Sequence, residues 1–124
     1  QPDRMETLGA CYENAAMLQK AGVIIAIQTN DAHNARNLPY EAGLAVANGL
    51  PYEEALKAIT ANPARIFKVD QQIGTLEKGK RANLIIANGD PLEPKTVIEK
   101  VFIGGIEMPD TNYQKQLWQD FIKH

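Results

Sequence analysis

The most distinctive pattern in the chain is an apolar run at residues 22–27, which soon gives way to side chains that can bind metal or accept protons. Apolar residues at consecutive positions, without polar alternation, are typical of a strand that is buried on both faces. In barrels of parallel strands, the catalytic groups collect at the carboxyl ends of the strands. Asp31 follows this run, so the sequence predicts a catalytic carboxylate there.

A helix is predicted on the amino-terminal side of the run. Asp3 and Glu6 have the spacing of a capping box, and Gly22 supplies a stop signal. Between them, apolar residues recur at helical spacing, at Met5, Leu8, Tyr12, Ala15 and Leu18. A helix followed by a buried strand is typical of one half of a larger repeating unit.

Further helices are predicted after the polar loop 32–38. Asn37 can cap the first of them, because the proline two positions later tolerates the missing amide of a first helical turn. A second helix is expected at residues 52–60, and Asn62 followed by proline repeats the cap signal for a third. Together with the preceding helix and strand, these segments predict an α/β architecture.

The periodicity changes at Asp70, after which short β candidates alternate with turns. Strands are expected at residues 73–76, 82–86, 97–103 and 106–108, the last two joined by a tight turn at Gly104-Gly105. Residues 112–123 carry an apolar helical face, and we expect this tail helix to dock on the body of the protein.

Composition excludes several classes of function. The formal net charge of -2 gives no electrostatic reason to expect nucleic acid as a partner. The longest apolar run, residues 21–27, is far below the roughly 18 residues that a transmembrane helix needs. Cys11 is the only cysteine and cannot form an internal disulfide. The chain starts at Gln1 rather than methionine, so we expect the natural amino terminus to lie upstream.

Seven short motifs follow one another in a specific order, at residues 29–32, 37–43, 53–64, 73–80, 82–86, 89–92 and 101–105. In this order and at this spacing they resemble the carboxyl-terminal portion of the metal-dependent amidohydrolase superfamily, in its imidazolonepropionase-like and prolidase-like branch. The motifs are specific to the superfamily and leave the substrate open.

The resemblance implies a distorted (β/α)8 metallohydrolase barrel, with a β-sandwich lobe built from both chain ends and one or two divalent metal ions, expected to be zinc. Residues 1–69 would then hold the last helix–strand unit of the barrel and the helices after it. Residues 70–110 would form part of the sandwich lobe, and residues 111–124 a tail helix. The implied activity is hydrolysis of carbon–nitrogen bonds in a small amide, cyclic amide or peptide-like substrate, by a homo-oligomer.

By resemblance, Asp31 binds the metal and acts as general base, taking a proton from the attacking water. The superfamily usually places this aspartate directly after Thr or Ser, whereas here Asn30 intervenes after Thr29. The alternative is that Asp31 only caps or turns the loop. His33, Arg36 and Asn37 lie on the same loop, where they could contact substrate or be solvated and capping residues.

Most of the metal ligands that the resemblance requires are absent. The superfamily needs a His-x-His pair, a bridging residue and two further histidines, but the only histidines here are His33 and His124. We therefore expect the chain to be a fragment of a larger enzyme, inactive and without bound metal by itself. The rival hypothesis is a stand-alone, non-catalytic binding or assembly module that kept this lobe and lost the barrel.

Overall fold

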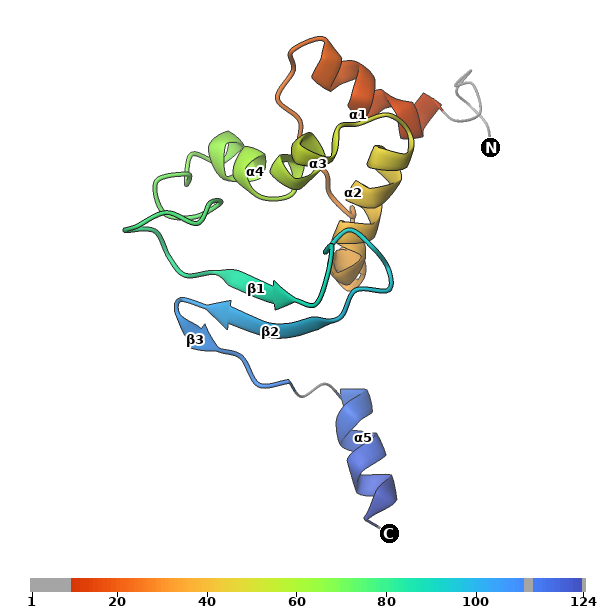
Figure 1. The fold of residues 1–124 in the computed structure, drawn as a ribbon, viewed down its shortest axis with the longest axis vertical. Coiled ribbons are helices and arrows are strands. Elements are labelled where there is room, and N and C mark those ends of the chain that lie inside the picture. The colour runs from red at the N-terminus through yellow and green to blue at the C-terminus, as the bar shows by residue number, and fades with distance from the viewer. Residues whose placement is uncertain (1–9, 111–112, 124) are drawn as a thin grey trace.

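The computed structural model describes residues 10–110 and 113–123, and in this part of the chain the helices and the strands segregate into two layers. Four α-helices lie above a three-stranded sheet, and a fifth α-helix follows the sheet (Figure 1). The elements are α1 (Ala10–Lys20), the 3₁₀ helix η1 (Ala32–Asn37), α2 (Leu38–Ala47), α3 (Tyr52–Ala58), α4 (Ala61–Ile66), β1 (Leu84–Ala87), β2 (Ile98–Ile103), β3 (Ile106–Glu107) and α5 (Tyr113–Ile122).

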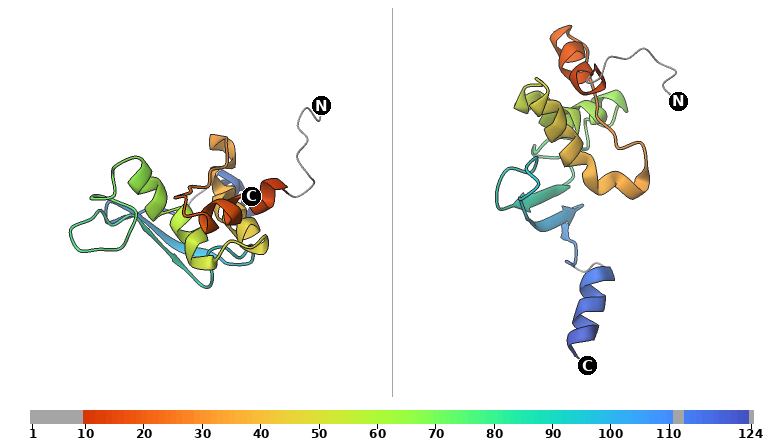
Figure 2. Two further views of the ribbon diagram at one scale, coloured as in Figure 1. Left: turned by 90° about the horizontal axis from the view of Figure 1, so that it is seen from above. Right: turned by 90° about the vertical axis from the view of Figure 1, so that its right-hand side faces the viewer.

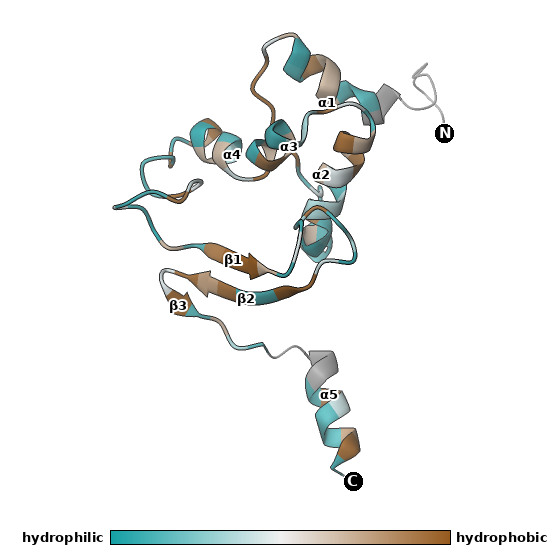
Figure 3. Ribbon diagram, viewed as in Figure 1, coloured by the Kyte–Doolittle hydropathy of each residue, from teal (hydrophilic) through white to brown (hydrophobic). Residues whose placement is uncertain are grey.

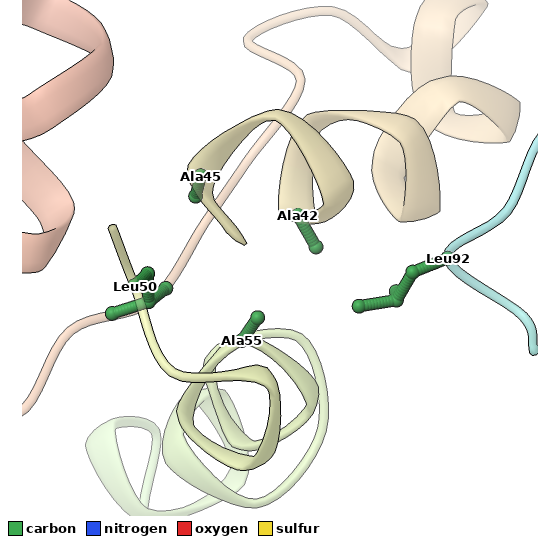
Figure 4. Close-up of a cluster of buried hydrophobic side chains, with 5 residues drawn as sticks. All are labelled: Ala42, Ala45, Leu50, Ala55 and Leu92. Carbon is green, nitrogen blue, oxygen red and sulfur yellow. The ribbon is translucent and has the colours of Figure 1, made fainter. Parts of the chain in front are cut away.

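The buried core is small and made mostly of alanine. Figure 4 shows the cluster of Ala42, Ala45, Leu50, Ala55 and Leu92, all at most 7% exposed. The small side chains of α2 and α3 let these two helices approach closely. Leu92 comes from the loop between β1 and β2, so this loop joins the helical layer to the sheet.

Gly43 marks the closest approach between α2 and this loop. A β-carbon at position 43 would lie 2.9 Å from the backbone oxygen of Leu92, which is shorter than real contacts of this kind. The absence of a side chain therefore allows the loop to seat Leu92 in the core. This contact fixes the position of the sheet relative to α2.

The apolar run expected to form a buried strand is extended but pairs with no strand in the described part of the chain. Val23 and Ile24 are 47% and 50% exposed. Helices hold the segment instead: the Ile27 amide donates to the Ala58 carbonyl at 2.9 Å, and the Asn62 side-chain amide donates to the Ile25 carbonyl at 2.9 Å. The expected strand is therefore absent from the described part of the chain, because a strand forms only when its backbone finds a neighbouring strand; its pairing in a larger barrel stays a prediction.

The sheet is antiparallel, with the order β1-β2-β3. Leu84 pairs with Phe102, and Ile103 pairs with Ile106 across the hairpin. Gly104 and Gly105 form the turn with φ of 59° and 80°, which confirms the hairpin expected there. Residues 73–76, expected to be a strand, form bends and an irregular connection instead.

One face of the sheet is apolar and uncovered. The register places Ile85 opposite Val101 and Ile103 opposite Ile106, and these four side chains are 36–67% exposed. Figure 3 shows the hydrophobic colouring along the strands, and Figure 2 shows that helices α1–α4 lie to one side of the sheet. A sheet with an exposed apolar face lacks the packing partner that such a face normally has.

Two expectations about helix ends and packing need correction. Helix α4 begins at Ala61 with Thr60 in the cap position, so Asn62 lies inside the helix and binds Ile25 rather than capping. The tail helix α5 does not dock on the body: Trp118 and Phe121 are 62% and 76% exposed (Figure 1). The capping box at residues 3–6 lies outside the described residues.

Candidate active-site loop

The chain turns sharply where the extended segment enters η1. Asn30 adopts a left-handed φ of 62°, a conformation that asparagine tolerates better than most residues. Asp31 is extended, with φ of -148° and ψ of 135°, and it caps η1. Its carbonyl accepts hydrogen bonds from the Thr29 hydroxyl and the Asn34 amide, both at 3.1 Å. Asn30, the residue that departs from the superfamily pattern, is thus the residue whose left-handed conformation makes this turn.

The Asp31 carboxylate is held through one of its two oxygens. Oδ1 accepts a hydrogen bond from the His33 backbone amide at 2.9 Å and lies 3.0 Å from His33 Nδ1. These contacts, the backbone hydrogen bond first, lower the pKa of the Asp31 carboxyl below its ordinary value of 3.8. In the described part of the chain Oδ2 has no hydrogen-bond partner. At neutral pH the loop therefore presents an ionised carboxylate with one free oxygen.

Both side chains of the pair are open to solvent. The Asp31 side chain is 53% exposed and the His33 side chain is 94% exposed. An ion pair this exposed contributes little to stability, because water screens it. The pair therefore remains available to a ligand or to another part of a larger protein.

Arg36 and Asn37 share the loop but are not drawn into this pair. Arg36 lies in the last turn of η1 and is exposed. Asn37 occupies the cap position of α2 without a side-chain hydrogen bond to the helix, so the expectation that it caps through its side chain is wrong. Of the four residues that the sequence singled out, the structure brings Asp31 and His33 into contact.

These side chains do not form a metal site by themselves. Within the described ranges, no group of three or more histidine, cysteine, aspartate or glutamate residues could hold a metal ion. Catalytic zinc sites use three protein ligands. Asp31 and His33 together offer two donors, so a metal would need ligands from outside the described residues.

A second polar contact, which the sequence did not single out, links α3 to the loop before β2. The Tyr52 hydroxyl donates to Asp90 Oδ1 at 2.8 Å, and the Leu92 amide donates to the same oxygen at 2.9 Å. The hydrogen bond to Asp90 is the main cause that raises the pKa of Tyr52 above 10.0. The Asp90-Pro91 pair signals a turn, but its contact with Tyr52 depends on the tertiary fold.

Residues 3–108 match the amidohydrolase family. The chain belongs to the amidohydrolase family. This amidohydrolase is 33% identical to the imidazolonepropionase of Picrophilus torridus over 113 residues, which cover 84% of the chain and 29% of that protein. The resemblance read from the motifs of the sequence is thereby confirmed.

Solved structures of two proteins resemble the amidohydrolase chain. An amidohydrolase from Thermotoga maritima has a TM-score of 0.75 and 35% identity, over 79% of this chain and 26% of that one. An adenosine deaminase from Xanthomonas campestris with bound zinc has a TM-score of 0.57 and 24% identity, over 88% of this chain and 33% of that one. The chain thus spans about a quarter to a third of these proteins, and its mixed α/β fold is the one found in that portion.

Proposed function

We propose that this chain is the carboxyl-terminal part of a metal-dependent hydrolase that acts on carbon–nitrogen bonds, with Asp31 as metal ligand and general base. The observation that carries the proposal is the state of Asp31. Its carboxyl has a lowered pKa, is half exposed, and keeps Oδ2 free at the end of an extended apolar segment. A general base must be ionised and within reach of the proton that it accepts.

The proposed architecture divides the chain in three. Residues 1–69 supply the last helix–strand unit of a (β/α)8 barrel and the helices after it, residues 70–110 part of a β-sandwich lobe, and residues 111–124 a tail helix. The 29% share of the Picrophilus protein supports a longer parent. Exposed apolar side chains support a longer parent too, because no described residue covers them. They are Val23 and the side chains of the Ile85 face of the sheet, which consists of Ile85, Val101, Ile103 and Ile106.

The proposed cofactor is a divalent metal, zinc first, with Asp31 as one ligand and the remaining ligands from the rest of the parent. A bound metal of this kind lowers the pKa of water and polarises a carbonyl oxygen. The proposal draws support from family membership and from the zinc in the Xanthomonas structure. Ligands from elsewhere in the parent would complete the metal site, because the described residues alone offer too few metal-binding side chains.

Asp31 has the features that proton transfer requires. Contacts from His33 hold Oδ1 in place, so Oδ2 can accept a proton from the attacking water and return it to the leaving nitrogen. His33, Arg36 and Asn37, on the same exposed helical loop, are proposed to contact a small amide, cyclic amide or peptide-like substrate. His33 would orient the carboxylate, because it binds the oxygen that does not carry the proton.

The test is Asp31→Asn in the longer parent. Asparagine keeps an oxygen that can accept the His33 amide, so the loop should keep its fold while the base is lost. We expect kcat to fall by a factor of about 100 to 10,000. Asp70→Asn, a carboxylate of the same chain that lies beyond the loop, should leave kcat unchanged. Turnover near normal in Asp31→Asn would show that this carboxylate is not the base.

A further inference from the structure

A groove of about 230 Å³ lies between α2, the start of α3 and the loop that follows β1. Its wall includes Tyr40, Leu44, Tyr52, Asp90, Glu93 and Pro94. The volume is below the roughly 300–1,000 Å³ of sites that hold whole small molecules. A groove of this size suits one long side chain rather than a complete metabolite.

The charge of the groove is of one sign. Asp90 and Glu93 contribute two carboxylates, and none of the residues in the wall is lysine, arginine or histidine. Tyr52 and Leu92 both donate to Asp90 Oδ1, so Asp90 Oδ2 and the Glu93 carboxylate have no hydrogen-bond donor in the described part of the chain. Two carboxylates among the residues of the wall therefore lack a cation in the described part of the chain.

The rest of the wall suits the stem of a long basic side chain. Leu44 and Pro94 are apolar, and Tyr40 is 52% exposed, so its ring is accessible. A cation that lies over a tyrosine ring is attracted by the negative face of the ring, while methylene groups pack on apolar walls. Negative charge, an aromatic ring and apolar walls in one narrow groove are complementary to a lysine or arginine side chain.

We propose that this groove binds a lysine or arginine side chain of a partner protein. The Glu93 carboxylate and Asp90 Oδ2 receive the cationic head, Tyr40 lies beside it, and the apolar wall holds the stem. Tyr52 positions Asp90 through their hydrogen bond and need not contact the ligand. The groove is remote in the sequence from Asp31 and its occupation does not depend on the hydrolase activity.

The test uses saturation-transfer NMR on the longer parent protein, with Nα-acetyl-lysine methylamide as the probe and Nα-acetyl-norleucine methylamide as its uncharged counterpart. We expect a signal on the lysine methylenes that is much stronger than that of norleucine. Glu93→Gln should weaken binding of the lysine probe about twofold to fivefold, as expected for one exposed ion pair. Glu99→Gln, a matched change on exposed β2, should leave binding unchanged.

A second variant separates the ring from the charge. Tyr40→Leu keeps an apolar surface and should weaken the lysine probe about twofold to fivefold, which is the contribution of an exposed cation–π contact. Equal signals for lysine and norleucine, or a lysine signal unaffected by both Glu93→Gln and Tyr40→Leu, would overturn the proposal. A lysine signal unaffected by both substitutions would mean that the probe binds elsewhere on the protein. The same result is expected if the parent's own chain covers the groove.

Discussion

At the scale of single residues, Asp31 combines an observed structural role with the catalytic role that we propose for it. Its Oδ1 accepts the His33 amide and caps η1, which is the structural alternative that the sequence left open. Its Oδ2 is uncommitted among the described residues, so capping does not exclude the proposed proton transfer. The observed cap uses Oδ1, and the proposed proton transfer would use Oδ2 of the same carboxylate.

Tyr52 gives a prediction about pH at the same scale. The hydrogen bond to Asp90 stabilises the neutral phenol and raises the pKa of Tyr52 above 10.0. Because the folded-state pKa is raised, the stabilisation is fully present below pH 10 and is lost as pH rises through the folded-state pKa. We expect an absorbance titration of tyrosinate to show a late-titrating group that disappears in Tyr52→Phe.

Asp90→Asn provides the control for this titration. The variant keeps an oxygen acceptor but removes the negative charge, so Tyr52 should titrate closer to 10.0. A late-titrating group that persists in Tyr52→Phe, or a titration of Tyr52 that is unchanged in Asp90→Asn, would show that Tyr52 does not make this contact in solution.

At the scale of elements, the approach of α2 to the loop after β1 is the contact most sensitive to substitution. The β-carbon of Gly43→Ala would meet the Leu92 carbonyl at 2.9 Å, and neither backbone can move without disturbing Ala42 or Leu92 in the core. Overpacking of this kind typically costs about 1–3 kcal/mol. Alanine recovers about 1 kcal/mol as a better helix former than glycine.

We therefore expect Gly43→Ala to lower the free energy of unfolding by up to about 2 kcal/mol in a urea titration. Ala47→Gly, at an exposed position of the same helix, isolates helix propensity and should cost about 1 kcal/mol or less. A stabilised Gly43→Ala variant would mean that the loop does not pack on α2 at this distance.

Local signals predicted the elements whose stability is local. The helix expected at residues 52–60 is α3, and the strands expected near residues 97–103 and 106–108 are β2 and β3, because helical periodicity and a Gly104-Gly105 turn act over short distances. Residues 22–27 carry an equally strong strand pattern but remain unpaired among the described residues. An apolar pattern predicts that a segment will be buried, but it does not identify the neighbouring segment that buries it.

The candidate site was predictable to a similar extent. Asp31 and His33 were singled out as candidates because polar side chains follow an apolar run; the structure places them in contact, and their roles in catalysis stay predictions. The groove beside Tyr52 and Asp90 was not predicted from the sequence. These two residues are 38 positions apart and meet only through the packing of α3 on the loop after β1. The docking of α5 was predicted wrongly, since an amphipathic face does not reveal which surface covers it.

At the scale of the whole molecule, the chain exposes more apolar surface than its small core can balance. Val23, Ile24 and the four side chains of the Ile85 face are all at least 36% exposed. No helix of the described residues is long and apolar enough to cross a bilayer. Because exposed apolar faces lack the packing partner that such faces normally have, we expect these surfaces to be covered by protein, either the rest of a parent or another copy.

We predict that the 124-residue chain, expressed alone, is stable only as a dimer or higher assembly, or aggregates. Residues 23–27 pair with no strand in the described part of the chain and expose apolar side chains at Val23 and Ile24, so they are a template for pairing with another chain. Light scattering across a dilution series, combined with amide exchange, measures this. A concentration-independent monomer with strongly protected amides at residues 23–27 would favour the stand-alone, non-catalytic module instead.

The central claim is that the active site is completed by residues outside this chain, and a calorimetric titration with Zn²⁺ tests it most directly. The 124-residue chain should show no tight stoichiometric site, because Asp31 and His33 offer two donors where zinc sites use three or four protein ligands. The longer parent should retain the ion, and Asp31→Asn in that parent should weaken its binding. A tight one-to-one zinc site in the 124-residue chain would contradict the account.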